Sequence, residues 1–292
     1  MTKILITGAN SFVGTNFKIY SRYRDVEEIS LLNNEPEDID FSKYNVVIHL
    51  AAIVHQSKKI TKSEYFQINK DLCLRVADNA KKAGISQFIF LSTVKVYGKF
   101  IPESGLLNED SKCVPGDFYA QSKYEAEIGL IKRGDMNFTV SIIRTPLVYG
   151  ERVKANMLRM VKLVDTNPLL PFGRMENKRD FTYIENLVSF IDQIISKNAS
   201  GIFIVKDEKA ISTTDLVNYL SKHLGRKVTL FKLPKLFRKF CTFFAPDVMD
   251  RLYGSLEFDN EKTKMKINYK PPFSTEEGVR KMVLYYKGRK RN

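Results

Sequence analysis

Three residues of the sequence have side chains that could take part in proton transfer. Tyr119 and Lys123, in the segment Tyr-Ala-Gln-Ser-Lys, lie four residues apart, which places a phenol and an ammonium on one face of a helix. A phenol is a poor base at neutral pH, but a nearby ammonium lowers its pKa by stabilising the phenolate. Thr93 follows the apolar run at 88–91, where its hydroxyl could hydrogen-bond a substrate oxygen. This set predicts acid–base catalysis with Tyr119 as the base.

A glycine turn near the start of the sequence strengthens this prediction, because a Tyr-x-x-x-Lys spacing alone is common on solvated helices. The segment from Thr7 to Gly14 lies between an apolar run and a helical stretch, the context in which such a turn holds a dinucleotide pyrophosphate. Ser11 replaces the usual middle glycine and can cap the helix. A structural turn without a ligand is the alternative. The turn residues expected to bind the cofactor are Gly8, Asn10, Ser11, Phe12, Val13 and Gly14.

The choice of cofactor depends on the end of the second apolar run. An Asp or Glu there would favour NAD and an Arg would favour NADP, but the run ends at Leu32 and Asn33. Asp38 and Ile39 lie in the next segment, from which they could contact the adenine, and the negative charge of Asp38 disfavours a 2′-phosphate. The sequence therefore favours NAD, with NADP as the alternative.

The elements that must position these residues follow an alternating pattern. Strand-like apolar runs occur at 3–7, 28–32, 45–50, 87–92 and 138–143, and helical spacing fills the segments between several of them. This βαβ alternation predicts an α/β fold with a Rossmann-type doubly wound parallel sheet. We expect residues 1–150 to form the dinucleotide-binding domain.

The pattern changes after residue 150. Helical stretches are expected near 153–165, 185–196 and 213–223, and a strand near 201–205 could return to the first sheet. Residues 151–292 are therefore expected to form mainly a smaller C-terminal α/β lobe that binds the substrate.

Several motifs in a fixed order resemble the extended short-chain dehydrogenase/reductase family, of the NAD-dependent epimerase/dehydratase type. The resemblance covers essentially the whole chain, and within the family the sequence looks like nucleotide-sugar epimerases and reductases, especially UDP-sugar 4-epimerases and 4-keto-6-deoxy-hexosamine reductases. The motifs are the glycine turn, His49-Leu50-Ala51-Ala52, Asn69, Ser92 to Gly98, Tyr119 to Lys123, and Arg144 to Gly150.

The resemblance implies a role for each matching position. Tyr119 is the base, Lys123 lowers its pKa and holds the nicotinamide ribose, and Thr93 orients the C4 oxygen of the sugar. The further cofactor contacts it implies are Leu50, Ala51, Ala52, Asn69, Tyr119, Pro146 and Val148. The substrate contacts it implies are Thr93, Val94, Asn156, Met157, Leu170, Phe172, Arg179 and Arg251, where the two arginines suit a diphosphate.

The implied reaction is oxidation at C4 of a UDP-hexose or UDP-N-acetylhexosamine. A 4-epimerase acting through a 4-keto intermediate is favoured, and a 4-keto-6-deoxy-sugar reductase is the alternative. A dehydratase is disfavoured, because Val94 and Lys95 stand where dehydratases carry Asp-Glu. A non-catalytic dinucleotide sensor is an alternative from another class. Family members are often homodimers.

Composition limits the remaining classes of function. The 292 residues include 47 Lys and Arg against 33 Asp and Glu, a formal net charge of +14. No apolar run reaches the roughly 18 residues of a membrane span. Three widely spaced cysteines predict a reducing cytoplasm, and His49, His55 and His223 lack the spacing of metal ligands, so no metal is expected.

The basic charge gathers in the last quarter, where 18 Lys and Arg accompany 7 Asp and Glu from Ser221 to Asn292. No nucleic-acid-binding motif accompanies it, so nucleic acid is not expected as a partner. The segment from Lys232 to Phe244 combines an apolar stripe with basic residues. A helix that packs within the lobe is the favoured interpretation, and a helix on a membrane surface is the alternative.

Overall fold

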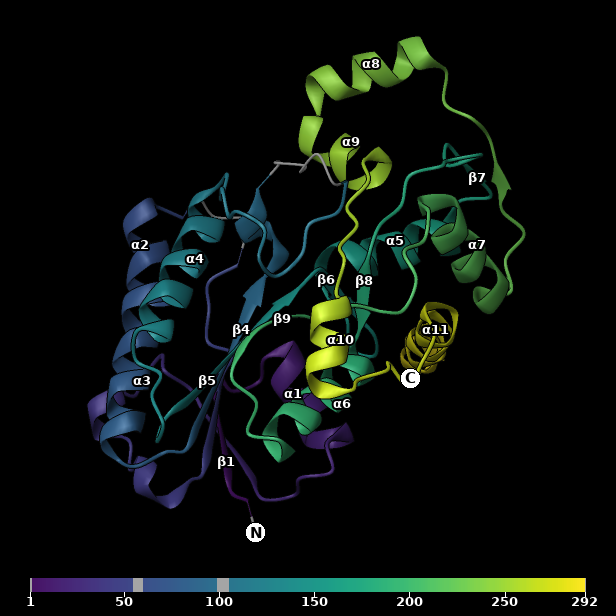
Figure 1. The fold of residues 1–292 in the computed structure, drawn as a ribbon. Helices are drawn as coiled ribbons and strands as arrows, with labels where there is room; N and C mark the ends of the chain where they lie inside the picture. Colours follow the sequence, from purple (N-terminus) through teal and green to yellow (C-terminus); the bar gives the residue numbers. More distant parts are fainter. Residues whose placement is uncertain (1, 55–59, 99–104, 292) are drawn as a thin grey trace. The chain divides into compact units, whose positions relative to one another are not determined.

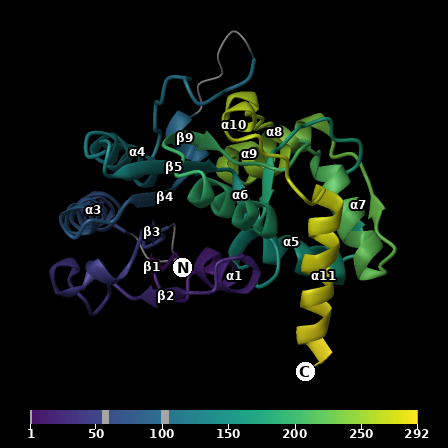
Figure 2. The ribbon, with the colours of Figure 1, turned by 60° about the horizontal axis from the view of Figure 1, so that its bottom comes forward.

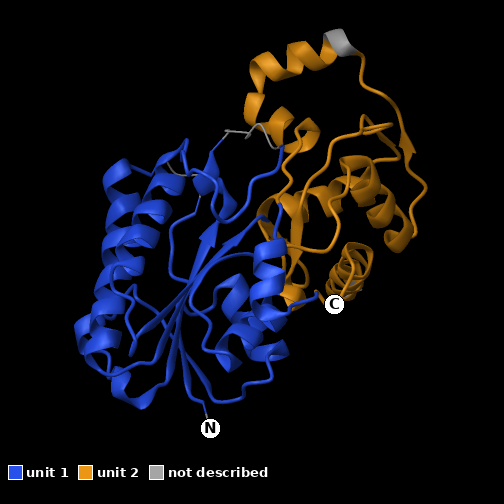
Figure 3. Cartoon of the chain, in the orientation of Figure 1, with its two compact units in different colours: residues 1–146, 187–205, 259–270 blue, residues 147–186, 206–258, 271–292 orange. Residues whose placement is uncertain are grey.

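The structure, a computed structural model, describes residues 2–54, 60–98 and 105–291, without the side chains at 235, 236 and 291. His55 lies outside the described residues. The chain divides into two compact units (Figure 3). Unit 1 comprises residues 1–146, 187–205 and 259–270, and unit 2 comprises residues 147–186, 206–258 and 271–292.

Six parallel strands form the central sheet of unit 1, in the order β2-β1-β3-β4-β5-β9 (Figure 2). Their bounds are β1 (Ile4–Thr7), β2 (Val26–Ile29), β3 (Val46–His49), β4 (Gln87–Thr93), β5 (Thr139–Thr145) and β9 (Gly201–Ile204). The predicted Rossmann-type α/β fold is confirmed. The segment near 201–205 joins the sheet as β9, beside β5.

One strand of this sheet is displaced from its predicted position. The sequence predicts a strand at 28–32, whereas β2 ends at Ile29. Strand β1 ends at Thr7, which pairs with Ile29, and the amides of Gly8 and Ala9 then donate to the Ile29 carbonyl. The glycine turn therefore ends the pairing, and the apolar Leu31 packs against the core from outside the strand.

Helices cover both faces of this sheet (Figures 1 and 2). Alanines of the helices, such as Ala77 and Ala126, allow close approach to Phe88 and Phe90 of β4 in the core. One face carries α2 (Lys62–Phe66), η3 (Gln67–Leu72), α3 (Cys73–Lys82) and α4 (Phe118–Ile131), and the other carries α1 (Phe12–Tyr20) and α6 (Ile184–Ser196). The remaining elements of unit 1 are η1 (Pro36–Asp38), η2 (Phe41–Lys43), η4 (Val94–Tyr97) and α10 (Glu261–Ile267).

The carboxyl ends of the parallel strands lie at one edge of the sheet. Thr7, His49 and Thr93 end β1, β3 and β4, and the ladder pairs Thr7 with His49. Ligands of doubly wound sheets bind at this edge. The register therefore gathers the glycine turn, the Leu50–Ala52 segment and Thr93 in one region of unit 1.

Unit 2 contains two small parallel strand pairs and five helices within the described residues. Strand β6 pairs with β8, and β7 pairs with β10. The bounds are β6 (Leu147–Tyr149), α5 (Ala155–Thr166), β7 (Leu169–Leu170), β8 (Phe181–Tyr183), α7 (Thr213–Leu224), β10 (Thr229–Leu230), α8 (Lys235–Phe244), α9 (Pro246–Tyr253) and α11 (Thr275–Arg291). The helices expected near 153–165, 185–196 and 213–223 are present as α5, α6 and α7.

A buried carboxylate joins the three chain segments of unit 2. Asp207 accepts hydrogen bonds from the Tyr149 hydroxyl at 2.9 Å and from the Tyr183 amide and the Asn186 side chain at 2.8 Å each. The Thr275 hydroxyl donates at 3.3 Å. These bonds satisfy the charge of a nearly inaccessible side chain, as burial of a carboxylate requires. In the part of the chain that the structure describes, no helix is long and apolar enough to cross a membrane.

Candidate active site

The glycine turn connects β1 to α1 with a backbone that only glycine adopts easily. Gly8 has a φ of +109°, and a Cβ at this position would lie 2.6 Å from the amide nitrogen of Ala51. The amides of Leu50 and Ala51 both donate to the carbonyl of Thr7, at 2.8 and 2.9 Å. The turn and the segment after β3 are therefore held in backbone contact.

The first turn of α1 has the geometry of an anion site. The Ser11 hydroxyl caps the helix by accepting from the Gly14 amide at 3.1 Å, and Asn10 adopts a φ of +59°. The amides of Phe12 and Val13, in the first turn, have no intrahelical partner because of their position. The helix dipole adds partial positive charge. The turn thus fits a dinucleotide pyrophosphate, and Ser11 takes the capping role expected of it.

Replacing Gly8 with Ala should weaken cofactor binding. The added methyl group meets the backbone of Ala51 and strains a left-handed φ, so the turn must move away from the segment after β3. We expect the Kd for NAD to rise at least about tenfold, measured by calorimetric titration. Gly288→Ala is the matched control, since a Cβ there meets no atom within 4 Å. An unchanged Kd in Gly8→Ala would contradict a pyrophosphate site at this turn.

The side chains of Tyr119 and Thr93 come together at the end of β4. Tyr119 lies in the first turn of α4, which Asp117 caps by accepting from the Ala120 amide at 2.7 Å. Burial and the charge of Asp117 raise the pKa of Tyr119 to about 12, and a hydrogen bond with Thr93 opposes this rise. The sequence predicted a lowered pKa for Tyr119, and this prediction is wrong for the protein without a ligand. Burial disfavours the phenolate more than the neighbouring groups stabilise it.

Lys123 lies one turn further along α4 and is buried. Its ammonium nitrogen is 3.9 Å from the centroid of the Phe90 ring. Burial lowers the pKa of Lys123 to about 8, although the nearby Cys73 and Glu127 raise it. The side chain is therefore mostly protonated at neutral pH and provides a desolvated positive charge.

Asn69 holds the segment after β3 to the helix that carries the tyrosine and lysine. Its side-chain oxygen accepts from the Ile53 amide at 2.7 Å, and its nitrogen donates to the Ile53 carbonyl and to the Ser122 hydroxyl at 3.1 Å each. Asn69 lies in η3, a single π-helical turn. In the structure this residue positions its neighbours. Sequence reasoning did not single out Ser122, because a Ser within a helix carries no distinct signal.

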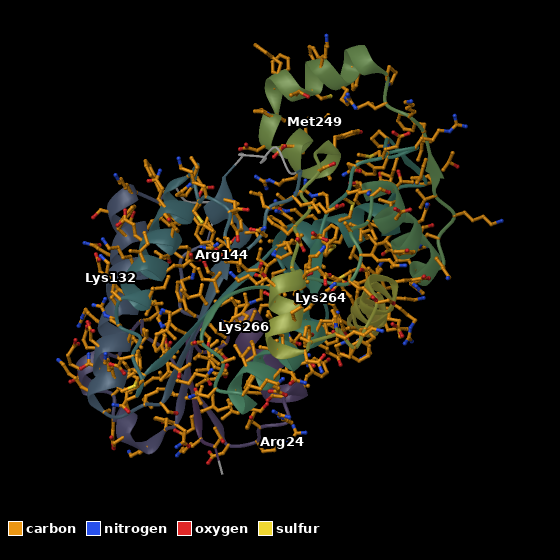
Figure 4. All side chains as sticks on the ribbon, viewed as in Figure 1. Arg24, Lys132, Arg144, Met249, Lys264 and Lys266 are labelled. Carbon is orange, nitrogen blue, oxygen red and sulfur yellow. The ribbon has the colours of Figure 1, made fainter. Side chains whose placement is uncertain are left out.

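A buried ion pair joins α4 to β5, and it was also missed from the sequence. Glu127 of α4 and Arg144 of β5 (labelled in Figure 4) are 1% and 3% exposed in their side chains and approach to 2.6 Å. The Ser92 hydroxyl donates to Glu127, and Arg144 donates to the Tyr97 hydroxyl at 2.8 Å. This network fixes α4 to the ends of β4 and β5. The available signal was Arg144, a charged residue that directly follows the apolar run at 138–143 and lies within β5.

His49 is a structural residue. Its Nδ1 lies 2.8 Å from the Thr7 hydroxyl, and its ring stacks near Phe88 and Phe90. Burial and the charge of Lys123 lower the pKa of His49 to about 3. Among the described residues, no group of three His, Cys, Asp or Glu side chains could hold a metal ion.

The neutral state of His49 should make the stability of the protein depend on pH. An unfolded chain protonates a histidine near pH 6.5, whereas the folded protein protonates His49 only near its lowered pKa of about 3. The contribution of the neutral His49 to the free energy of unfolding is therefore complete above the pKa of a histidine in the unfolded chain. This contribution is lost as the pH falls below that pKa. We expect this group to lower the free energy of unfolding by about 1.4 kcal/mol between pH 7.5 and 5.5.

Urea unfolding at both pH values measures this dependence. In His49→Gln, the difference between the free energies of unfolding at pH 7.5 and 5.5 should be about 1.4 kcal/mol smaller than in the wild type, whatever the variant's stability at pH 7.5. Equal pH dependence in both proteins would contradict a neutral, buried His49.

The other expected cofactor residues lie in varied surroundings. Asn33 and Asp38 are exposed, and Asp38 belongs to η1. Ile39 packs against the hydrophobic core, so its side chain has a structural role. Leu50, Ala51 and Ala52 are half-buried beside the glycine turn, Pro146 is buried, and Val148 in β6 is half-buried.

Two arginines of unit 2 lie close enough to influence each other. Arg179 donates through Nη1 to the carbonyls of Asp250 and Gly254, at 3.0 and 2.8 Å. Burial lowers the pKa of Arg179, the charge of Asp250 raises it, and the charge of Arg251 lowers it again. Neighbouring like charges are unfavourable without an anion between them, so this pair is suited to a diphosphate.

The other expected substrate residues are mostly buried. Met157, Leu170 and Phe172 of unit 2 are 2–3% exposed, and Val94 of unit 1 is 4% exposed. Asn156 is exposed in the first turn of α5. The Lys95 ammonium, beside Val94, forms an ion pair with Asp117 at 2.9 Å. The buried side chains are packed within their units. A ligand could therefore contact only a small part of the surface of each of these side chains.

The chain is similar to known proteins over most of its length. The sequence model of the NAD dependent epimerase/dehydratase family matches residues 4–205. A UDP-glucose 4-epimerase of Vibrio cholerae is 32% identical over 309 aligned residues, which cover 95% of this chain and 93% of the relative. An N-acetyl-alpha-D-glucosaminyl-diphospho-ditrans,octacis-undecaprenol 4-epimerase of Escherichia coli O157:H7 is 25% identical over 254 residues, covering 79% of this chain and 75% of the relative.

The fold is also found in solved structures. The UDP-glucuronic acid 4-epimerase of Bacillus cereus, in complex with NAD, superimposes with a TM-score of 0.76 at 22% identity over 99% of both chains. The family resemblance noted in the sequence is thereby confirmed, and so is NAD as the family's cofactor. Since the family model and the Vibrio relative each match well over half of the sequence, the chain belongs to the NAD dependent epimerase/dehydratase family.

Proposed function

We propose that the protein is a 4-epimerase of a UDP-hexose or UDP-N-acetylhexosamine that acts through a 4-keto intermediate. Membership of the family establishes an NAD-dependent enzyme of the nucleotide-sugar epimerase/dehydratase type. The observation that carries the proposal is the hydrogen bond between Thr93 and Tyr119 at the carboxyl edge of the sheet, in the same unit as the glycine turn. Intact catalytic residues disfavour a non-catalytic sensor.

The protein's own residues would handle the proton of the C4 hydroxyl. Thr93 would hydrogen-bond the C4 oxygen, and Tyr119 would take its proton and later return it, with the hydride chemistry supplied by NAD if it is bound. Because burial raises the pKa of Tyr119 to about 12, the phenolate needs additional positive charge near it. The desolvated ammonium of Lys123, which by the family resemblance would also hold the nicotinamide ribose, would supply that charge. Epimerisation then requires the hydride to return to the opposite face.

Unit 2 would bind the diphosphate of the substrate. Its two negative charges match the paired guanidinium groups of Arg179 and Arg251. The carbonyls of Asp250 and Gly254 fix one nitrogen of Arg179, which orients the planar group before a ligand arrives.

The nucleotide that the protein carries distinguishes an epimerase from a reductase. We expect denaturation of the purified protein to release stoichiometric NAD, because an epimerase must retain its cofactor through both hydride transfers. The purified protein should then convert a UDP-hexose or UDP-N-acetylhexosamine to its C4 epimer without added cofactor. An empty site that binds NADPH and reduces a 4-keto-6-deoxy sugar nucleotide would establish the reductase instead.

A lipid-linked sugar diphosphate is a second candidate substrate. The Escherichia coli relative acts, by its name, on a sugar joined through a diphosphate to undecaprenol. The exposed aromatic surface of α8, the helix that precedes the one bearing Arg251, favours this candidate. Assays of the same N-acetylglucosamine attached to UDP and to a polyprenyl diphosphate in detergent micelles would separate the two substrates. A homodimer and a cytoplasmic location stay predictions.

A further inference from the structure

Helix α8 exposes four phenylalanine side chains in a continuous surface, which we call the aromatic patch. Phe237, Phe240, Phe243 and Phe244 are 55%, 58%, 82% and 68% exposed. Ring centroids are separated by 6.2 Å between Phe237 and Phe240, 4.7 Å between Phe240 and Phe244, and 5.2 Å between Phe243 and Phe244. Phenylalanine is usually buried, so a patch of this kind marks an interaction surface.

The interior of unit 2 does not cover this patch. Helix α8 lies at the outer edge of the unit and contacts α9 (Figures 1 and 3). Met249 (labelled in Figure 4) is a buried side chain of α9, whereas the neighbouring Val248 is 50% exposed and extends the apolar surface. The favoured interpretation from the sequence, a stripe packed within the lobe, is therefore wrong for Phe237, Phe240 and Phe244.

The charge on α8 and on the segment before it is entirely basic, and the first acidic residue after the patch is Asp247 at the start of α9. Between Asp215 and Asp247 the sequence contains seven Lys or Arg and no Asp or Glu. Of these seven, Lys232, Arg238 and Lys239 are exposed on α8 or just before it. Aromatic rings bordered by lysine and arginine are typical of helices that lie at an anionic membrane surface.

We propose that α8 docks this protein on an anionic membrane surface, with the phenylalanine rings inserted beneath the headgroups. Charge complementarity favours a bilayer over a second copy, because two copies joined through this patch would bring equal positive charges together. The helix has 10 residues, so it lies in the plane of the surface. Docking does not depend on the proposed function, since it requires only α8.

Sedimentation with vesicles tests docking with the full-length protein. We expect binding to vesicles of phosphatidylglycerol and phosphatidylcholine and little binding to phosphatidylcholine alone. The triple variant Phe240→Ser/Phe243→Ser/Phe244→Ser should reduce the partition coefficient by about 100-fold. Arg238→Glu/Lys239→Glu should reduce it at least about tenfold. Met136→Ser is the matched control, because this fully exposed apolar side chain lies outside α8.

The variants must keep their fold for this comparison, which NAD affinity and the thermal midpoint of unfolding check. Should the triple variant not fold, Phe243→Ser alone removes the most exposed ring and should lower partitioning about fivefold. Equal partitioning of wild type and Phe variants overturns the proposal, as does failure of the wild type to bind anionic vesicles. Dimerisation without lipid that is lost in the triple variant also overturns it, since a second copy then covers the patch.

Discussion

Replacing Tyr119 with Phe should lower turnover by about 10²- to 10⁴-fold on a confirmed sugar nucleotide. The substitution removes the hydroxyl that hydrogen-bonds Thr93 and keeps the ring, which lies 6.3 Å from the Tyr65 ring. Without that oxygen, the proposed reaction loses the group that would take the C4 proton. NAD affinity should change little, because the glycine turn and α1 are untouched. Steady-state kinetics and calorimetric titration measure the two quantities.

Tyr124→Phe is the matched control, since Tyr124 is a half-buried tyrosine of the same helix. It should retain the turnover of the wild type. If Tyr119→Phe also kept full activity, the assignment of the base would be incorrect. Loss of NAD affinity together with activity would instead indicate that the hydroxyl supports the fold of the site.

Replacing Glu127 with Ala should lower the free energy of unfolding by about 3–5 kcal/mol. The substitution leaves the buried guanidinium of Arg144 without its charge partner, and Ser92 loses its acceptor. An uncompensated buried charge costs far more than a lost surface contact. Because Glu127 lies one turn after Lys123 on α4, the variant should also lose activity through displacement of that helix. Urea unfolding measures the stability.

Glu125→Ala provides the matched control on the same helix. Glu125 pairs with Lys70 at 2.9 Å, but the side chains are 45% and 30% exposed, so its loss should cost less than about 1 kcal/mol. The double variant Glu127→Leu/Arg144→Met should recover much of the stability lost by Glu127→Ala, since apolar side chains can replace a buried ion pair. A cost below about 1 kcal/mol for Glu127→Ala would mean that water reaches Arg144.

Local patterns in the sequence predicted most of the fold of unit 1. Apolar runs and the glycine turn located the strands, because each of these patterns is contained in a short contiguous segment of the sequence. The position of β2 was missed, since it depends on the pairing of Thr7 with Ile29, which a single run does not reveal. The aromatic stripe of α8 was visible in the sequence, but its exposure depends on how unit 2 folds around it.

The candidate site was predicted only where a motif marks it. The network of Glu127 and Arg144 joins a helix to a strand 17 residues away, and Asn69 reaches Ser122 across 53 residues. The local sequence does not show which of these residues pair, so only the tertiary structure reveals the pairing. The raised pKa of Tyr119 was not predicted for a related reason. It results from burial, which is a property of the folded protein.

Strand β9 is far from its partner β5 in the sequence, which affects how the chain folds during synthesis on the ribosome. Strand β5 ends at Thr145, but its neighbour in the sheet begins only at Gly201, after a long segment that belongs largely to unit 2. At about 5–20 residues per second, β5 remains an unpaired edge for roughly 3–12 seconds. Unpaired apolar edges invite association with other nascent chains, so this interval is when the growing polypeptide most needs a chaperone.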